Sequence, residues 1–270
     1  MTYTPVLPIS GYAGWTVLNR TMAAQTAAFN KSPEIKRDED YFLAKIGSVK
    51  TADQLVNDPR LLKVALGAFG LDADISNKAF IKKVLADGTV SSSALANKLS
   101  DKRYQQFSAA FGFGLSTPST QLSDFGAKIV KAYKSREFET AVGNQDEDLR
   151  LALNAQREVA DLAGKATSDT TKWYTILGNT PLTTVFQKAL GLPSSTGSLN
   201  LDQQLTIYQS KLKSVFGSGG VGQFTDSTKV DALIKRFLVR SQADQLISQT
   251  SGTSIALTLM QQAGSRNASR

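Results

Sequence analysis

The sequence contains neither cysteine nor histidine among its 270 residues. Without cysteine there is no disulfide and no thiol nucleophile, and without both residue types the usual zinc sites are excluded. A Ser-His-Asp triad and imidazole acid–base chemistry are excluded too, because both require histidine. Most familiar enzyme chemistries are therefore absent, and we predict a non-enzymatic protein without catalytic, metal-binding or cofactor-binding residues.

Long hydrophobic runs are also missing. The longest uninterrupted apolar stretch, residues 64–71, includes two glycines and is far shorter than the roughly 20 residues that cross a bilayer. The first 30 residues lack the basic start and the hydrophobic block of a secretory signal. We expect no signal peptide and no transmembrane segment, and a protein that is cytoplasmic at synthesis. Export by another route stays open.

What the sequence does contain is helical periodicity. Hydrophobic residues make up 41% and charged residues 20%, which is ordinary globular composition. Val230, Leu233, Ile234, Phe237 and Leu238 follow the spacing of one helical stripe, and residues 182–190 repeat that spacing. Residues 59–69 are apolar on two adjoining stripes, which predicts the most central helix. We predict an all-α fold, an irregular bundle of about ten helices.

Helix boundaries have their own signals. Asp58-Pro59 and Thr180-Pro181 each place a capping oxygen before a proline, as is typical of helix starts, and Ser76 is predicted to cap the next helix. Glycine closes many helices in a left-handed conformation. The predicted stops are Gly70, Gly88, Gly112, Gly143, Gly164, Gly178, Gly191 and Gly217.

Residues 61–71 and 182–192 resemble each other, sharing Leu, Val, Ala, Gly and Leu at equivalent positions. This similarity favours two related helical halves, about 40–115 and 120–240. The alternative is that small-large-Gly-apolar is simply how helices end. The predicted organisation is an amino-terminal helix over 1–30, a helical domain over 31–240, and a flexible tail with a short helix over 241–270.

Two short patterns resemble ligand-binding motifs, one for dinucleotides and one for calcium, but each lacks a feature that its motif requires. Residues 217–222 match the dinucleotide pattern GxGxxG, but an amphipathic helix precedes them where a strand is required, so we interpret them as a linker. Asp72, Asp74 and Ser76 occupy ligand positions of a calcium loop, but Asn77 and Lys83 stand where glycine and glutamate are needed.

Paired carboxylates offer one remaining route to catalysis. The clusters 38–40 and 146–148 each hold three acidic residues, and both stand at predicted helix starts, where acidic groups complement the helix dipole. A carboxylate-based cell-wall hydrolase would need two carboxyls roughly 5 to 9.5 Å apart in a cleft. It is kept as an alternative function.

The formal charge is +8, which favours acidic partners. Residues 1–135 carry 17 basic and 11 acidic groups and residues 136–270 carry 14 and 12, so neither half is a concentrated basic module. Lys229, Lys235, Arg236 and Arg240 are the best candidates for binding nucleic acid or an anionic surface. A solvated helix face is the simpler interpretation.

Both termini carry stripes that suit contact with a partner. Trp15, Leu18, Met22, Gln25 and Phe29 lie at heptad spacing, although docking onto the protein's own bundle is the commoner outcome. Near the other end, the short stripe consists of Ala256, Leu259, Met260 and Ala263. The candidate interaction surface consists of the four basic residues above together with Trp15, Leu18, Met22, Phe29, Leu259 and Met260.

Several segments together carry a family resemblance. They are residues 10–15 (SGYAGW), 40–42 (DYF), 58 and 61–71 (LLKVALGAFGL), 80–85 (FIKKVL), 101–104 (DKRY) and 111–113 (FGF). On these the chain resembles an uncharacterised alphaproteobacterial family encoded within flagellar gene clusters. The resemblance implies protein partners among flagellar components, a role in flagellar structure or assembly, and export by the flagellar apparatus as an open alternative.

Overall fold

The computed structural model describes residues 3–267, and side chains over 3–248. Within that part the chain forms thirteen α-helices, five short 3-10 helices and no strand. The α-helices are α1 (Gly11–Asn30), α2 (Pro33–Lys45), α3 (Ala52–Asn57), α4 (Pro59–Gly67), α5 (Lys78–Asp87), α6 (Leu95–Lys98), α7 (Lys102–Phe111), α8 (Phe125–Gly143), α9 (Glu147–Gly164), α10 (Asp169–Leu177), α11 (Thr180–Leu190), α12 (Leu201–Phe216) and α13 (Ser227–Asn267). The all-α prediction is confirmed, with more helices than the ten expected.

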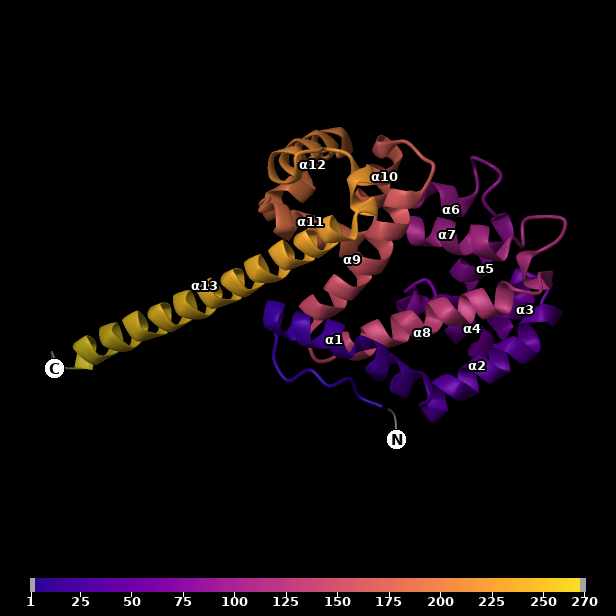
Figure 1. Cartoon of the computed structure of the whole chain (residues 1–270), viewed down its shortest axis with the longest axis horizontal. Coiled ribbons are helices and arrows are strands. Elements are labelled where there is room, and N and C mark those ends of the chain that lie inside the picture. Colours follow the sequence, from indigo (N-terminus) through magenta and orange to yellow (C-terminus); the bar gives the residue numbers. More distant parts are fainter. Residues whose placement is uncertain (1–2, 268–270) are drawn as a thin grey trace.

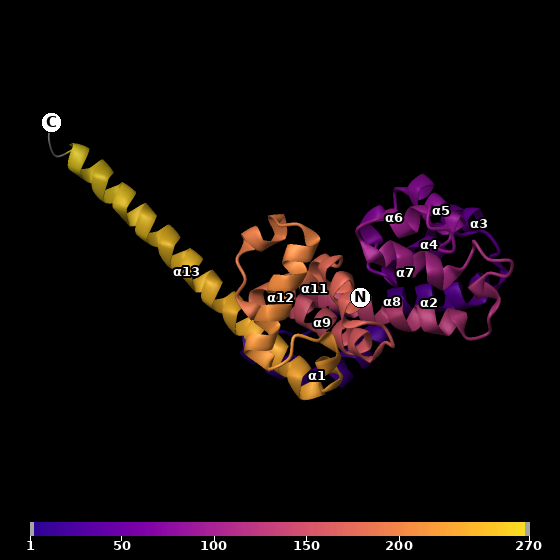
Figure 2. The ribbon, with the colours of Figure 1, turned by 90° about the horizontal axis from the view of Figure 1, so that it is seen from above.

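The helices gather into two lobes. Helices α2 to α8 pack together in the first lobe and α9 to α13 in the second, while α8 and α9 pack against each other at the junction. Helix α1 crosses the junction and contacts α8, α9 and α13. The two lobes lie side by side in Figure 2. The predicted halves divide the chain before α8, whereas α8 packs on α2 and α4 of the first lobe.

The core follows the hydrophobic stripes. In α4, Leu61 and Val64 on one stripe and Leu62 and Leu66 on the other are all buried, so this helix fills the interior of the first lobe. Helix α9 takes the corresponding place in the second lobe, where it packs against α8, α11 and α13. Two central helices therefore replace the single one that was predicted.

Most helix ends lie where local signals place them. The Asp58 carboxylate accepts from the backbone N–H groups of Arg60 and Leu61, at 3.0 and 3.1 Å, and starts α4. Two predicted caps are displaced by one residue. Asn179, not Thr180, caps α11, and α5 begins after Asn77 rather than after Ser76, without a side-chain cap.

Residues 61–71 and 182–192 end in the same local structure. Gly70 and Gly191 both adopt positive φ, at +67° and +66°. The next residue, Leu71 or Leu192, donates its backbone N–H to a carbonyl five residues back, at 3.0 and 2.9 Å. This is the Schellman arrangement that ends many helices, and it accounts for the shared glycine and the leucine after it. The relation between the two halves stays a prediction.

Helix α13 differs from the predicted flexible tail with its short separate helix. It continues unbroken from Ser227 to Asn267, and its second half leaves the body and projects into solvent (Figure 1). No proline interrupts this stretch, so the backbone can keep its helical hydrogen bonds through the Ser/Thr/Gly-rich segment. None of the described helices combines the length and hydrophobicity needed to cross a bilayer.

Candidate functional site

A groove runs along the junction of the two lobes. Two adjoining hollows, of about 410 and 310 Å³, share Gln106, Leu162, Lys165 and Thr175 in their walls. The groove is walled by α7 and α8 of the first lobe and by α9 and α10 of the second. Residues far apart in the sequence therefore meet here, and this is where chemistry can be assembled.

A smaller polar cavity of about 100 Å³ adjoins the groove and shares Arg136 with it. We call it the arginine cavity. Its lining residues are Gly70, Asp72, Arg103, Arg136, Glu139, Thr140, Arg150, Asn154, Asn179 and Pro181. Three arginine side chains from three different helices thus line one small space. No pattern in the sequence brings these arginines together.

An ion-pair network supports the cavity wall. Arg136 Nη2 lies 2.6 Å from Glu158 Oε1, and Arg157 forms a bidentate pair with Glu139, at 2.8 and 3.0 Å. Burial lowers the pKa of Arg136, and the neighbouring Arg157 charge lowers it further. Burial by itself would raise the pKa of Glu158, but Arg136 and Arg157 hold it below its usual value. The two arginines therefore keep Glu158 ionised.

A second polar cluster lies between α2, α4 and α8. Asp38, which is 7% exposed, accepts from Lys63 Nζ at 2.9 Å and from the Tyr133 hydroxyl at 3.0 Å. Nearby on α8, burial raises the pKa of Glu137 to about 7, and the charge of Asp72 adds to the effect. No sequence pattern indicates that Glu137 is unusual, because the shift of its pKa depends on burial.

The two acidic clusters noted in the sequence do not converge on a cavity. In the first, Glu39 pairs with Lys134 at 2.9 Å and Asp40 with Lys36 at 2.6 Å. In the second, Asp146 caps α9 by accepting from the backbone N–H of Leu149 at 3.0 Å. No group of three or more acidic side chains that could hold a metal ion occurs within residues 3–248.

The other members of the second cluster are also engaged in structural contacts. Glu147 pairs with Arg150, whose Nε lies 2.7 Å from Glu147 Oε2. Asp148 accepts from Ser241 on α13 at 2.5 Å. These carboxylates therefore stabilise α9 and its contact with α13.

The amino-terminal stripe faces the protein's own body. Trp15, Leu18 and Phe29 are at most 3% exposed, and the half-buried Met22 packs against the same core. The buried Gln25 accepts from the backbone N–H of Val6 at 2.7 Å. In this structure the stripe is therefore an internal packing surface.

The four basic candidates are held by neighbouring elements. The Lys235 ammonium lies 5.2 Å from the centre of the Tyr12 ring, and Arg236 Nε donates to the Ala189 carbonyl at 3.2 Å. Lys229 donates to Gln223 at 3.2 Å. The guanidinium of the exposed Arg240 packs against Gly191. The structure therefore uses these residues partly to attach α13 to α1 and α11.

The side chains of Leu259 and Met260 lie outside the described part of the chain. Their backbone belongs to the projecting half of α13 (Figure 1). Their place in the candidate interaction surface therefore stays a prediction.

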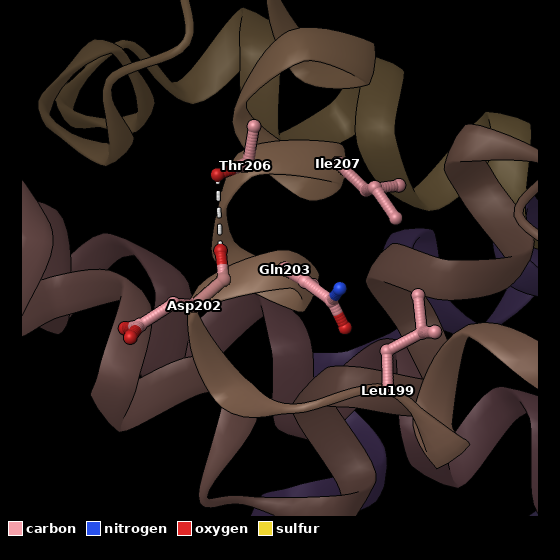
Figure 3. Close-up of a pocket in the computed structure, with 5 residues that line it drawn as sticks. All are labelled: Leu199, Asp202, Gln203, Thr206 and Ile207. Atoms are coloured by element: carbon pink, nitrogen blue, oxygen red, sulfur yellow. Dashed lines mark hydrogen bonds between the residues drawn. The ribbon is translucent and has the colours of Figure 1, made fainter.

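A shallow apolar depression of about 390 Å³ lies on α12. Leu199, Gln203 and Ile207 point toward a common space, whereas the Asp202 carboxylate turns away from it (Figure 3). Asp202 instead accepts from the Tyr174 hydroxyl at 2.9 Å. With no charged group directed into it, this depression offers apolar surface and no catalytic group.

The GxGxxG segment connects α12 to the 3-10 turn η5 (Val221–Thr225). Trp173 Nε1 donates to the Gly219 carbonyl at 2.9 Å, and the Gly222 N–H donates to Asp169 at 3.2 Å. The segment is thus packed onto α10, as a connection between helices.

Comparison with known proteins places the groove within a family. A crystal structure from a structural-genomics consortium, of a protein from Agrobacterium tumefaciens, is similar to this chain with a TM-score of 0.72 and 25% identity. The similarity covers 88% of this chain and 98% of that one. No curated protein matches the chain. The model of a family described as "Protein of unknown function (DUF1217)" matches residues 68–230, which include every residue lining the groove and the arginine cavity. The chain therefore belongs to this family.

Proposed function

We propose that the protein acts without catalysis, through contacts with other proteins in the structure or assembly of the bacterial flagellum. The observation that carries the proposal is the projecting half of α13 (Figures 1 and 2). If the projecting half of α13 binds a partner, this would explain why the helix extends beyond the core of the protein. The flagellar context rests on a family resemblance. The segments that carry it are residues 10–15, 40–42, 58, 61–71, 80–85, 101–104 and 111–113.

The energetics of an isolated helix support a docking role. A helix gains most of its stability from packing, and short isolated helices are marginal in water. Residues 250–254 are Thr, Ser, Gly, Thr and Ser, all of which have weaker helix propensity than alanine or leucine. The 22 residues after Ser248 would span about 33 Å as a helix. A partner that covers this segment would supply the missing stabilisation.

The sequence of the segment suits such a partner. Ala256, Leu259, Met260 and Ala263 follow the i, i+3, i+4, i+7 spacing, which an apolar groove or a second helix recognises.

The two alternative functions have less support. The basic side chains of α13 contact α1 and α11, and the acidic clusters are paired or act as caps.

The proposal is tested by complementation in a flagellated alphaproteobacterium from which the gene has been deleted. We expect deletion to reduce swimming and flagellar number, and the full chain to restore both. A chain ending at Ser248 should fail to restore them. Unchanged swimming after deletion of the gene would contradict the flagellar role, whereas rescue by the shortened chain would contradict the docking role of α13.

Two matched double variants distinguish loss of docking from a general effect of added negative charge. Leu259→Asp with Met260→Asp places two charges on the apolar stripe, and Thr258→Asp with Ser265→Asp places two about half a turn away in the helical repeat. We expect only the first pair to abolish rescue. Immunoblots of cytosol, medium and purified basal bodies then distinguish an assembly factor, found only in the cytosol, from an exported structural component.

A further inference from the structure

We propose that the arginine cavity binds one hydrogen phosphate ion between the two lobes. This site is independent of the docking role of α13. It combines uncommitted cationic donors, an unsatisfied buried acceptor and a helix amino terminus in a space of about 100 Å³.

The cationic donors come from α8 and α9. Arg136 uses Nε on the Ala68 carbonyl, at 2.9 Å, and Nη2 on Glu158, at 2.6 Å. Arg150 uses Nε and Nη2 on Glu147. In each case Nη1 makes no hydrogen bond within the described structure. Each arginine therefore keeps one charged donor for an anion, held in place by its other bonds.

Gly70 makes the space for one of these donors. Its φ is +67°, and a Cβ at this position would lie 3.0 Å from Arg136 Nη1 and 3.5 Å from Arg103 Nη1. Arg103 is in turn anchored by its hydrogen bonds to Asp101 and to the Gly70 carbonyl. The absent side chain thus leaves the guanidinium groups room beside the cavity.

Asn154 supplies the observation that points to a ligand. It lines the cavity and is 4% exposed, yet its Oδ1 accepts no hydrogen bond from the described part of the chain. Leaving a buried polar group unpaired destabilises the folded protein. A bound group that carries a proton would satisfy this acceptor.

The carboxylates of the wall decide which anion fits. Glu139 is neutralised by its bidentate pair with Arg157, whereas the exposed Asp72 has no ion-pair partner within the described residues. A bare sulfate would face Asp72 and Asn154 with acceptors only. Hydrogen phosphate has the same shape and carries a proton that it can donate to either of them. The site should therefore prefer phosphate to sulfate.

The second lobe contributes a helix terminus. Asn179 caps the eleven-residue α11 by accepting from the Leu182 N–H at 3.3 Å, and both Asn179 and Pro181 line the cavity. The positive end of the helix dipole favours an anion there. The cavity has the volume of about three water molecules, which suits a free tetrahedral ion better than a nucleotide.

A bound ion would connect α8 of the first lobe with α9 and α11 of the second. We therefore expect phosphate to raise the unfolding temperature of the full chain by mass action. Calorimetric titration with inorganic phosphate, and with sulfate at matched ionic strength, should give saturable binding for phosphate and at least about tenfold weaker binding for sulfate. Absence of saturable phosphate binding, or equal affinity for sulfate, would overturn the proposal.

Variants locate the site. Arg150→Gln should weaken phosphate binding about tenfold, the usual effect of losing one charge-assisted hydrogen bond. Lys165→Gln removes the same charge from the adjoining groove, outside the arginine cavity, and should leave binding unchanged. Equal weakening by both variants would show a diffuse charge effect and would overturn the assignment.

Asn154→Leu gives a second test, in which weaker phosphate selectivity should accompany higher stability of the phosphate-free protein. Replacing the unpaired amide by an apolar side chain of similar size should stabilise the phosphate-free protein, because it removes the unsatisfied group. The same change should weaken the preference for phosphate over sulfate, because only Asp72 would then remain to accept the phosphate proton. A variant that is folded and prefers phosphate as strongly as the native protein does would exclude Asn154 from the site.

Discussion

Glu137 shows at the scale of one residue how burial changes chemistry. Its carboxyl is partly buried on α8, in the electrostatic field of Asp72, Lys63, Glu34 and Asp38. Burial is the largest cause of the rise in its pKa from 4.5 to about 7. The folded protein therefore holds the Glu137 proton more tightly than the unfolded chain does.

This difference predicts a pH-dependent stability. The folded state binds more protons than the unfolded state between pH 4.5 and about 7, so the free energy of unfolding falls as pH rises through that window. Because the chain has no histidine, the only other ordinary group that titrates near neutrality is the α-amino group. The pH dependence of stability therefore reports on Glu137, with a contribution of the same sign from Asp72, whose pKa burial also raises.

The substitution Glu137→Gln checks the prediction. Relative to the native protein, we expect the variant to gain about 1–3 kcal/mol between pH 5 and pH 8, since one pKa unit corresponds to about 1.4 kcal/mol. Denaturant unfolding at both pH values measures the change. Identical pH dependence of the two proteins would mean that the Glu137 carboxyl is solvated.

At the scale of elements, local signals and packing can be separated. The cap at Asp58 and the positive φ at Gly70 and Gly191 follow from short sequence patterns. The cap at Asn179 shows the limit of such patterns, because Asn179 and Thr180 are both suitable caps and the local pattern does not choose between them.

Two helical glycines illustrate the contribution of packing. A Cβ on Gly14 in α1 would lie 2.0 Å from the Ile9 carbonyl oxygen, whereas a Cβ on Gly164 in α9 would meet nothing within 4 Å. We expect Gly14→Ala to destabilise the protein by about 1–3 kcal/mol through overpacking. The matched Gly164→Ala should be neutral or stabilising by up to about 1 kcal/mol.

Chemical denaturation of both alanine variants measures the difference. Equal effects would show that the segment before α1 can move away from Gly14 at little cost. The expected inequality would confirm that the close contact, rather than intrinsic helix propensity, requires glycine at position 14.

At the scale of the whole molecule, the two lobes and the projecting half of α13 are distinct parts. Among the described residues, Gln245 attaches α13 to the body by donating its Nε2 to Asp148, at 3.1 Å. The second half of the helix leaves the lobes (Figure 1). The first half of α13 belongs to the core through Leu233, Ile234 and Phe237, all fully buried.

Removal of residues 249–270 should therefore leave the stability of the body unchanged. We expect the chain ending at Ser248 to have the unfolding temperature and denaturation midpoint of the full chain. A chain ending at Asp231 would lose the three buried side chains and serves as the destabilised control, each costing about 2–5 kcal/mol. A large loss of stability in the first chain would mean that the projecting half packs on the body in solution.

Local sequence patterns were sufficient to predict the helical class and most helix ends, because these depend on neighbouring residues. The absence of thiol and imidazole chemistry follows from composition alone. The meeting of Arg103, Arg136 and Arg150 in one cavity was not accessible in this way. They lie on α7, α8 and α9, and only the packing of those helices brings them together. The same holds for the pKa of Glu137 and the orphaned amide of Asn154, because burial and hydrogen-bond satisfaction arise from tertiary contacts.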